Sequence, residues 1–240
     1  MYTPEYSFRP LGSHADYGFG ATADAFKEAA DDLCAARATA PRLNGHIATS
    51  YLYRHAVELY LKSMIVLVHR RLQIPFGSHS AEGDPSMIVE GKAVPFHRIH
   101  SVAKSFAYLQ QLVNQHAERL GTFCRTDWSA LPSQILGWVS LVDDTDPKST
   151  FFRYPNPQSR ATDDTKSSFQ VGSPEEVIAR ASLSGKSVKT SVVLDDSDGI
   201  VETFYFNADV LPELQAALRS LAEFLEGMHF GMRIELAGGR

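Results

Sequence analysis

Three charged residues recur at every fourth position of the otherwise apolar stretch YLYRHAVELYLKSMIVLV, residues 51–68. They are Arg54, Glu58 and Lys62, and the 3.6-residue helical repeat places them on one stripe with His55 at its edge. Neighbouring members have opposite charges at an i,i+4 spacing, so the stripe can form an internal ion-pair ladder. The same groups can instead face a cleft and bind an anionic ligand. The pattern leaves both interpretations open.

Two histidines, His97 and His100, stand in the motif HRIH just before a strongly amphipathic stretch. The first turn of a helix offers free backbone N–H groups and positive potential, which favour an anion such as phosphate and a neutral imidazole. A neutral imidazole can act as a general base. The alternative is that these histidines have no functional role and are solvated residues next to the helix cap.

Two further polar groups lie in the second half of the chain. Arg153 and Tyr154 stand among aromatic residues in FFRYP, which fits either a ligand contact or an arginine resting over a ring. Asp143, Asp144 and Asp146 form an acidic run, and we expect an exposed loop there rather than a metal site.

The chain lacks the motifs GxGxxG, GxxxxGK[ST], GxSxG and HExxH, and we expect no cofactor.

Composition is that of an ordinary soluble globular protein, with 44% hydrophobic and 21% charged residues among 240. The net charge of −5 gives no overall basic field for non-specific nucleic-acid binding. Cys34 and Cys124 belong to no CxxC pair, which fits reduced thiols in a cytoplasmic protein. The first residues do not resemble a signal peptide, and no uncharged apolar run is long enough to span a membrane. We therefore expect a cytoplasmic protein without membrane contact.

Hydrophobic periodicity predicts a mainly α protein, a single domain over residues 1–240 in which a helical bundle carries one or two small β-hairpins. The predicted helices cover residues 22–40, 43–72, 97–121, 130–142 and 209–230. The other predicted segments are an extended arm at 1–20, a hairpin insertion at 73–96, a loop at 158–185 with a short strand near 169–171, and a β-hairpin at 186–206. The helix at 43–72 is apolar around most of its surface, so we expect it at the centre of the bundle.

The apolar surface of this bundle favours a homodimer. A leucine series recurs near heptad spacing in the C-terminal helix: Leu211, Leu214, Leu218, Leu221 and Leu225. With the helix at 43–72, these leucines offer more apolar surface than the shorter helices can cover. We therefore expect a second copy to pack against the bundle.

Three segments together resemble the HEPN superfamily of helical-bundle proteins: LYRHAVELYLKSMI at 52–65, HRIHSVAKSFAYL at 97–109 and STFFRYP at 149–155. The resemblance covers residues 22–155 and, more loosely, the C-terminal helix. It implies a homodimeric bundle and, as in many family members, metal-independent RNA cleavage by an Arg-x(4–6)-His motif at the dimer cleft. Here that spacing occurs only from Arg9 to His14, in the arm, so the resemblance supports the fold more than the cleavage.

Two functions follow from these residues and the resemblance. The first is a HEPN-like module that binds RNA, a nucleotide or a cognate protein partner in a bacterial defence or toxin–antitoxin system. The alternative is a metal-independent ribonuclease in which the 2′-hydroxyl attacks the adjacent phosphate. The predicted catalytic residues of that enzyme are His100, Arg54 and Arg153. The predicted binding residues are His55, Glu58, Lys62, His97 and Tyr154.

Overall fold

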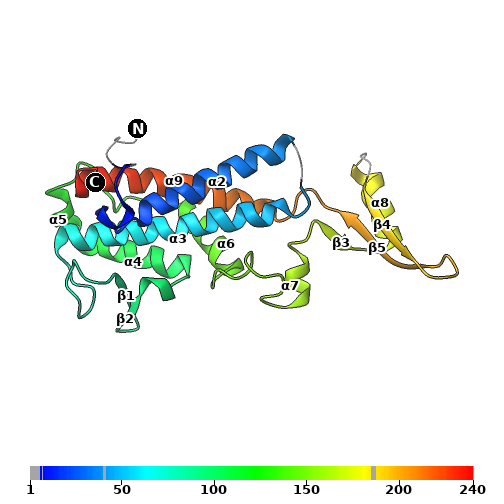
Figure 1. Ribbon diagram of the computed structural model, residues 1–240, viewed down its shortest axis with the longest axis horizontal. Coiled ribbons are helices and arrows are strands. Elements are labelled where there is room, and N and C mark those ends of the chain that lie inside the picture. Colours follow the sequence, from blue (N-terminus) through cyan, green and yellow to red (C-terminus); the bar gives the residue numbers. More distant parts are fainter. Residues whose placement is uncertain (1–5, 7, 40–41, 185–187, 240) are drawn as a thin grey trace.

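The computed structural model of the chain describes residues 6, 8–39, 42–184 and 188–239 and is mainly helical (Figure 1). The helices are α2 (Phe19–Thr39), α3 (Gly45–Leu72), α4 (Val102–Gln115), α5 (Ala117–Gly121), α6 (Gln134–Thr145), α7 (Arg160–Asp164), α8 (Pro174–Ser184) and α9 (Pro212–Ala237). The strands are β1 (Ser86–Val89), β2 (Lys92–Pro95), β3 (Phe169–Val171), β4 (Thr190–Leu194) and β5 (Ile200–Phe206). The predicted class, a mainly α protein with small antiparallel sheets, is confirmed over these residues. No described helix has both the length and the hydropathy that a bilayer crossing requires.

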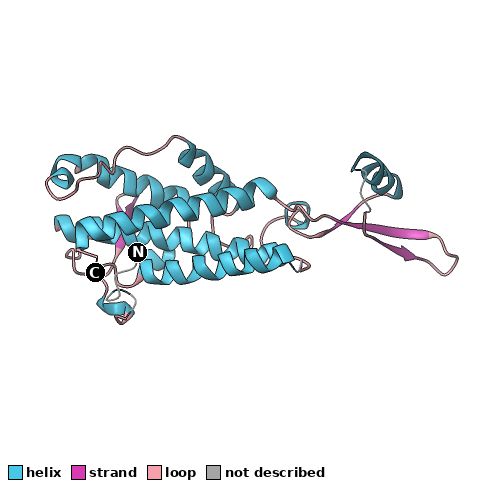
Figure 2. Cartoon of the chain, turned by 90° about the horizontal axis from the view of Figure 1, so that it is seen from above, coloured by secondary structure: helices cyan, strands magenta, loops and turns pink. Residues whose placement is uncertain are grey.

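Helix α3 lies at the centre of the bundle, with α2, α4 and α9 packed around it (Figures 1 and 2). Its apolar side chains point in nearly all directions, so it is stable only where neighbours cover every side. A residue in the left-handed conformation bounds each end, Asn44 with φ 55° and Gln73 with φ 53°. The helix predicted at 43–72 and its central position are confirmed.

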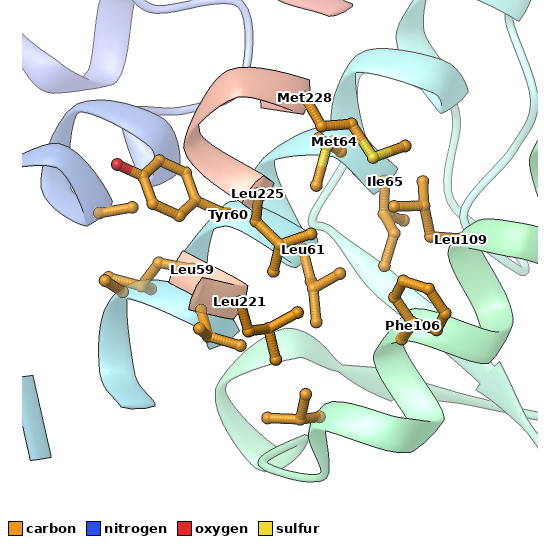
Figure 3. Packing of buried hydrophobic residues seen from close by; sticks show 14 of the residues in the cluster. Leu59, Tyr60, Leu61, Met64, Ile65, Phe106, Leu109, Leu221, Leu225 and Met228 are labelled. Carbon is orange, nitrogen blue, oxygen red and sulfur yellow. The ribbon is translucent and has the colours of Figure 1, made fainter. Parts of the chain in front are cut away.

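The core forms where α3, α4 and α9 meet (Figure 3). Leu61 and Ile65 of α3 are almost fully buried there. Their surroundings are Phe106 and Leu109 of α4, and Leu221, Leu225 and Met228 of α9. The leucines of α9 are thus covered within one chain, and the premise that they need a second copy to cover them is wrong.

The segment predicted as an extended arm is folded onto the bundle. His14 and Asp16 are buried, and α2 begins inside the segment, at Phe19. The Asp16 carboxylate accepts hydrogen bonds from two nearby amides at 3.0 and 2.6 Å, which ties the segment to the start of α2. Residues 1–5 and 7 of the predicted arm lie outside the described residues.

Two small antiparallel sheets are attached to the bundle. β1 pairs with β2 around Glu90 and Gly91, whose φ angles of 52° and 77° suit a tight hairpin, so the hairpin insertion predicted at 73–96 is confirmed. The second sheet has the order β3-β5-β4 and extends away from the bundle (Figure 2). It contains the hairpin predicted at 186–206, of which residues 186 and 187 lie outside the described part of the chain.

Some predicted boundaries are wrong. The segment 158–185, predicted as a loop with one short strand, contains α7 and α8 as well as β3. Val177 is the buried residue among the described side chains of α8, and a helix that buries so little gives a weak periodic signal. The helix predicted at 97–121 is divided into α4 and α5, and α9 continues to Ala237, past the predicted end at residue 230.

Candidate functional site

The charged stripe of α3 is a buried ion network. The side chains of Arg54, Glu58 and Lys62 are only 0%, 3% and 5% exposed. Nη1 of Arg54 lies 3.0 Å from one carboxylate oxygen of Glu58, and Nζ of Lys62 lies 2.6 Å from the other. The i,i+4 ladder that the sequence suggested is confirmed, and it lies inside the protein. One carboxylate therefore serves two cations of its own helix.

Arg54 also connects α3 to two other segments. Its Nη2 donates to the main-chain carbonyls of His100 and Asp146, the latter at 3.2 Å, and its Nε lies 3.8 Å from the Asp146 carboxylate. Asp146 in turn accepts hydrogen bonds from the amides of Thr150 and Phe151 at 2.6 and 3.0 Å. The guanidinium is thus surrounded by protein acceptors, which makes Arg54 a positioning residue.

His100 reaches the same carboxylate from outside α3. Its Nδ1 lies 3.3 Å from Oε1 of Glu58, and its side chain is 37% exposed. Burial opposes the ionisation of Glu58, but the charges of Lys62 and Arg54 outweigh it and hold the pKa of this carboxyl below its usual value. An ionised carboxylate only accepts hydrogen bonds, so this contact places a proton on Nδ1 of His100. In the neutral ring, Nε2 is then the basic nitrogen.

A cavity of about 690 Å³ lies beside this group, a size typical of small-molecule sites. We call it the histidine cavity because four histidines line it: His55, His79, His97 and His100. Phe19, Leu59 and Phe96 give it an apolar wall. Four of the predicted binding residues, His55, Glu58, Lys62 and His97, therefore line one cavity together with His100.

His55 lines the histidine cavity and has one fully buried ring nitrogen. Its Nδ1 makes no hydrogen bond within the described part of the chain. The ring is stacked parallel to Tyr51, with 5.9 Å between centroids, and lies perpendicular to Phe26, with 4.5 Å between centroids. Burial lowers the pKa of His55 more than Glu58 raises it, so the ring is neutral at neutral pH. A buried nitrogen without a hydrogen-bond partner is energetically costly.

A second cavity, of about 360 Å³, adjoins the first at His100, which lines both. Arg98, Lys104 and Lys148 line it without an acidic side chain among its described residues, and we call it the basic cavity. None of these three cations forms an ion pair with another described residue. Clustered cations without counter-charges produce a local positive potential that attracts anions. His100 therefore has a positive cavity on one side and a largely apolar, histidine-rich cavity on the other.

The start of α4 does not offer the free amides that the sequence suggested. The helix begins at Val102, and the side chain of Ser101 accepts a hydrogen bond from the amide of Lys104 at 3.0 Å. Asp143 accepts hydrogen bonds from the amide of Ala103 at 3.2 Å and from the Ser101 hydroxyl at 3.1 Å. Because the protein's own carboxylate occupies this helix start, the expectation that these amides hold an external anion is wrong.

Arg153 and Tyr154 lie apart from both cavities. Arg153 is exposed, and its guanidinium rests 5.7 Å from the ring centre of Tyr51. Tyr154 is 52% exposed. Arg54 meets the main chain of His100, but neither Arg54 nor Arg153 lines the two cavities. The grouping of these arginines around the His100 ring that the sequence suggested is not formed.

Sequence reasoning missed the three cations of the basic cavity, Arg98, Lys104 and Lys148. Two of them flank His100 in HRIHSVAK, so a local signal was present, but Lys148 reaches the cavity from the segment after α6. The acidic run is also placed differently from expectation. Its first two members belong to the last turn of α6. Asp146 is buried, and its carboxylate interacts with Arg54 and with two backbone amides.

Within the described residues, no three His, Cys, Asp or Glu side chains are arranged to hold a metal ion.

No protein-family model, curated protein or solved structure matches this chain.

Replacing Glu58 by alanine should destabilise the fold strongly, because Arg54 and Lys62 would remain buried without a counter-charge. We expect the unfolding free energy to fall by about 3–5 kcal/mol, as in other buried networks that lose one partner. The matched control is Glu223→Ala, which removes the acid of an exposed i,i+4 pair with Arg219 and should cost less than about 1 kcal/mol. Urea denaturation followed by circular dichroism measures both losses, and equal small losses would contradict the buried network.

The same measurement across pH tests the ionisation of Glu58. Its pKa is lowered in the folded state, so its contribution to stability is present above the usual pKa of a glutamate and is lost as the pH falls through the folded-state pKa. The difference in unfolding free energy between wild type and Glu58→Gln should be full at neutral pH and shrink on acidification. A difference that grew on acidification would mean that the carboxyl is protonated in the folded protein.

Proposed function

We propose that the chain is a HEPN-like module that binds RNA or a nucleotide where the histidine cavity and the basic cavity meet. The observation that carries this proposal is the position of His100, which lines both cavities and contacts the buried Glu58. A nucleotide joins a flat base, which has apolar faces and a polar edge, to an anionic phosphate, so its two ends need different surroundings. The two cavities supply such surroundings side by side.

The phosphate is assigned to the basic cavity. Arg98 offers a planar guanidinium that can hold two phosphate oxygens at once, and Lys104 and Lys148 add point charges. Because the chain as a whole carries a charge of −5, attraction must come from this local group. Affinity should therefore depend on salt and on these few side chains.

The base is assigned to the histidine cavity. Phe19 and Phe96 line it with their ring centroids 5.9 Å apart, and the ring of His55 also lines it. Stacking of a base on an aromatic side chain is worth about 1–3 kcal/mol and tolerates different bases. The polar edge of the base can then hydrogen-bond to the ring nitrogens of the histidines that surround it.

A second candidate function, cleavage of RNA, is favoured by one observation, the 3.3 Å contact between Nδ1 of His100 and Glu58. A histidine oriented by a carboxylate can accept the proton of the 2′-hydroxyl at Nε2 while that oxygen attacks the phosphorus. The bond from phosphorus to the 5′-oxygen then breaks, and the leaving oxygen takes a proton from a second group, for which His97 lies in the same cavity. The products would carry 2′,3′-cyclic phosphate and 5′-hydroxyl ends.

Binding is tested by titrating labelled single-stranded RNA and a nucleoside monophosphate with wild type, Arg98→Ala and Lys104→Ala. Each variant should bind RNA about tenfold more weakly and should flatten the plot of log affinity against log salt by about 0.7, the loss of one phosphate contact. The control is Lys92→Ala, which removes an exposed cation of β2 that lines neither cavity and should leave affinity unchanged. Failure of both ligands to bind at low salt would exclude the proposal and leave a protein partner as the remaining ligand.

The same RNA samples, analysed for product ends, decide between binding and cleavage. If the chain only binds, the RNA stays intact in every sample. If it cleaves, cyclic phosphate ends should appear with wild type and be lost in His100→Gln, while His116→Gln, a change outside both cavities, should leave them. Cleavage that survives His100→Gln would exclude His100 as the base.

A further inference from the structure

The sheet β3-β5-β4 extends from the bundle (Figure 2), and its edge strand β4 carries exposed apolar side chains. Val192, Val193 and Leu194 of this edge strand are 45%, 44% and 51% exposed. Single exposed apolar residues are ordinary, but a cluster of them on one small projecting element is typical of a contact surface.

Strand β4 forms an open edge of this sheet. It pairs with β5 on one side, and all five of its residues are exposed. The amide of Phe206 donates to the carbonyl of Lys189 at 2.8 Å, so these two opposite residues form a hydrogen-bonded pair of the antiparallel ladder. The alternation of an antiparallel ladder then turns the main-chain groups of Thr190, Val192 and Leu194 away from β5, toward the open edge.

The five residues of β4 lack the features that usually prevent edge-to-edge pairing, and the nearest charged residues, Lys189 and Asp195, stand just beyond its two ends. Such strands commonly carry a lysine, a proline or a central bulge. β4 reads TSVVL, without charge or proline, and its register irregularity lies at its end, between Val193 and Leu194. An extended chain can therefore add to β4 as a further strand.

We propose that the added strand is β4 of a second copy of this chain, antiparallel to the first about a two-fold axis at Val192. In this register Lys189 lies opposite Asp195 of the second copy, and the symmetry repeats this pair at the other end. The main-chain N–H and C=O groups of Val192, which point away from β5, then face the same groups of the second copy across the axis. The uncharged strand is thus flanked by two complementary charge pairs.

The charges also select the register. A pairing centred one residue away, on Ser191 or Val193, leaves Lys189 opposite Val193 or Ser197 and loses both charge pairs. The symmetric pairing gives one continuous sheet in which neither copy keeps an open β4 edge. The histidine cavity is bordered by the β1–β2 hairpin. The sheet lies toward the opposite end of the molecule from this hairpin (Figure 1). The proposed dimer therefore leaves the histidine cavity accessible.

Sedimentation equilibrium of the full chain tests the dimer. Wild type should give about twice the chain mass of 26.5 kDa at micromolar concentration. Lys189→Glu places an acid opposite Asp195 at both ends, and Val192→Pro removes the amide N–H at the axis, so each should raise the dimer Kd at least about tenfold. The matched control is Val201→Lys, which changes an exposed residue of β5 away from the edge and should leave the Kd unchanged.

A further variant separates the charge pair from general damage to the hairpin. Asp195 accepts hydrogen bonds from the amides of Ser197 and Gly199, both at 2.8 Å, and Asp195→Asn keeps an accepting oxygen while it removes the charge. Added to Lys189→Glu, it should restore part of the lost dimer affinity. Lys189 lies outside β4 and is exposed, so this pair of variants remains informative if the proline variant does not fold.

Three results would overturn the proposal. The first is a monomeric wild type at all micromolar concentrations. The second is a dimer that Val201→Lys weakens while Lys189→Glu does not, which would mean pairing through the sheet face. The third is a double variant that dimerises no better than Lys189→Glu alone, since the repulsion assigned to Asp195 would then be absent. Circular dichroism of each variant verifies that the helices are retained.

Discussion

A single buried carboxylate, that of Glu58, holds the charged centre of this protein together. Arg54 and Lys62 contact its two oxygens from the same helix, and His100 contacts it from another segment. Burying such charges is tolerated only if each finds its partners, so the position of α3 is coupled to the segments that carry His100 and Asp146. The apolar girdle of α3 drives it into the bundle, and the ion network determines which segments must lie beside it.

The same network explains where the candidate site lies. His100 is the member of the network with an exposed side chain, and it is the residue at which the histidine cavity meets the basic cavity. A fixed imidazole at such a junction is suited to a ligand with one apolar and one anionic end. The charges that stabilise the fold therefore also orient the group that we assign to the ligand, while the edge of the projecting sheet is the separate surface that we assign to dimer formation.

Local patterns were sufficient for the parts of the structure that depend on neighbouring residues in sequence. The i,i+4 spacing of Arg54, Glu58 and Lys62 predicted their pairing, and the apolar circumference of 43–72 predicted its burial. The convergence of Lys148 on the basic cavity and of Asp146 on Arg54 depends on the turn of the chain after α6, which no local period encodes. The short helix α8 was missed because it buries little apolar surface.

His100 is the residue whose surroundings a bound nucleotide should change most. Histidine-selective NMR during titration with a nucleoside monophosphate measures this directly, because each imidazole gives its own signals. We expect the signals of His100 and His55 to shift together along one binding curve, while those of His116, which lines neither cavity, stay in place. A nucleotide that leaves the His100 signals unmoved, or that shifts His116 instead, would contradict the assignment of the site.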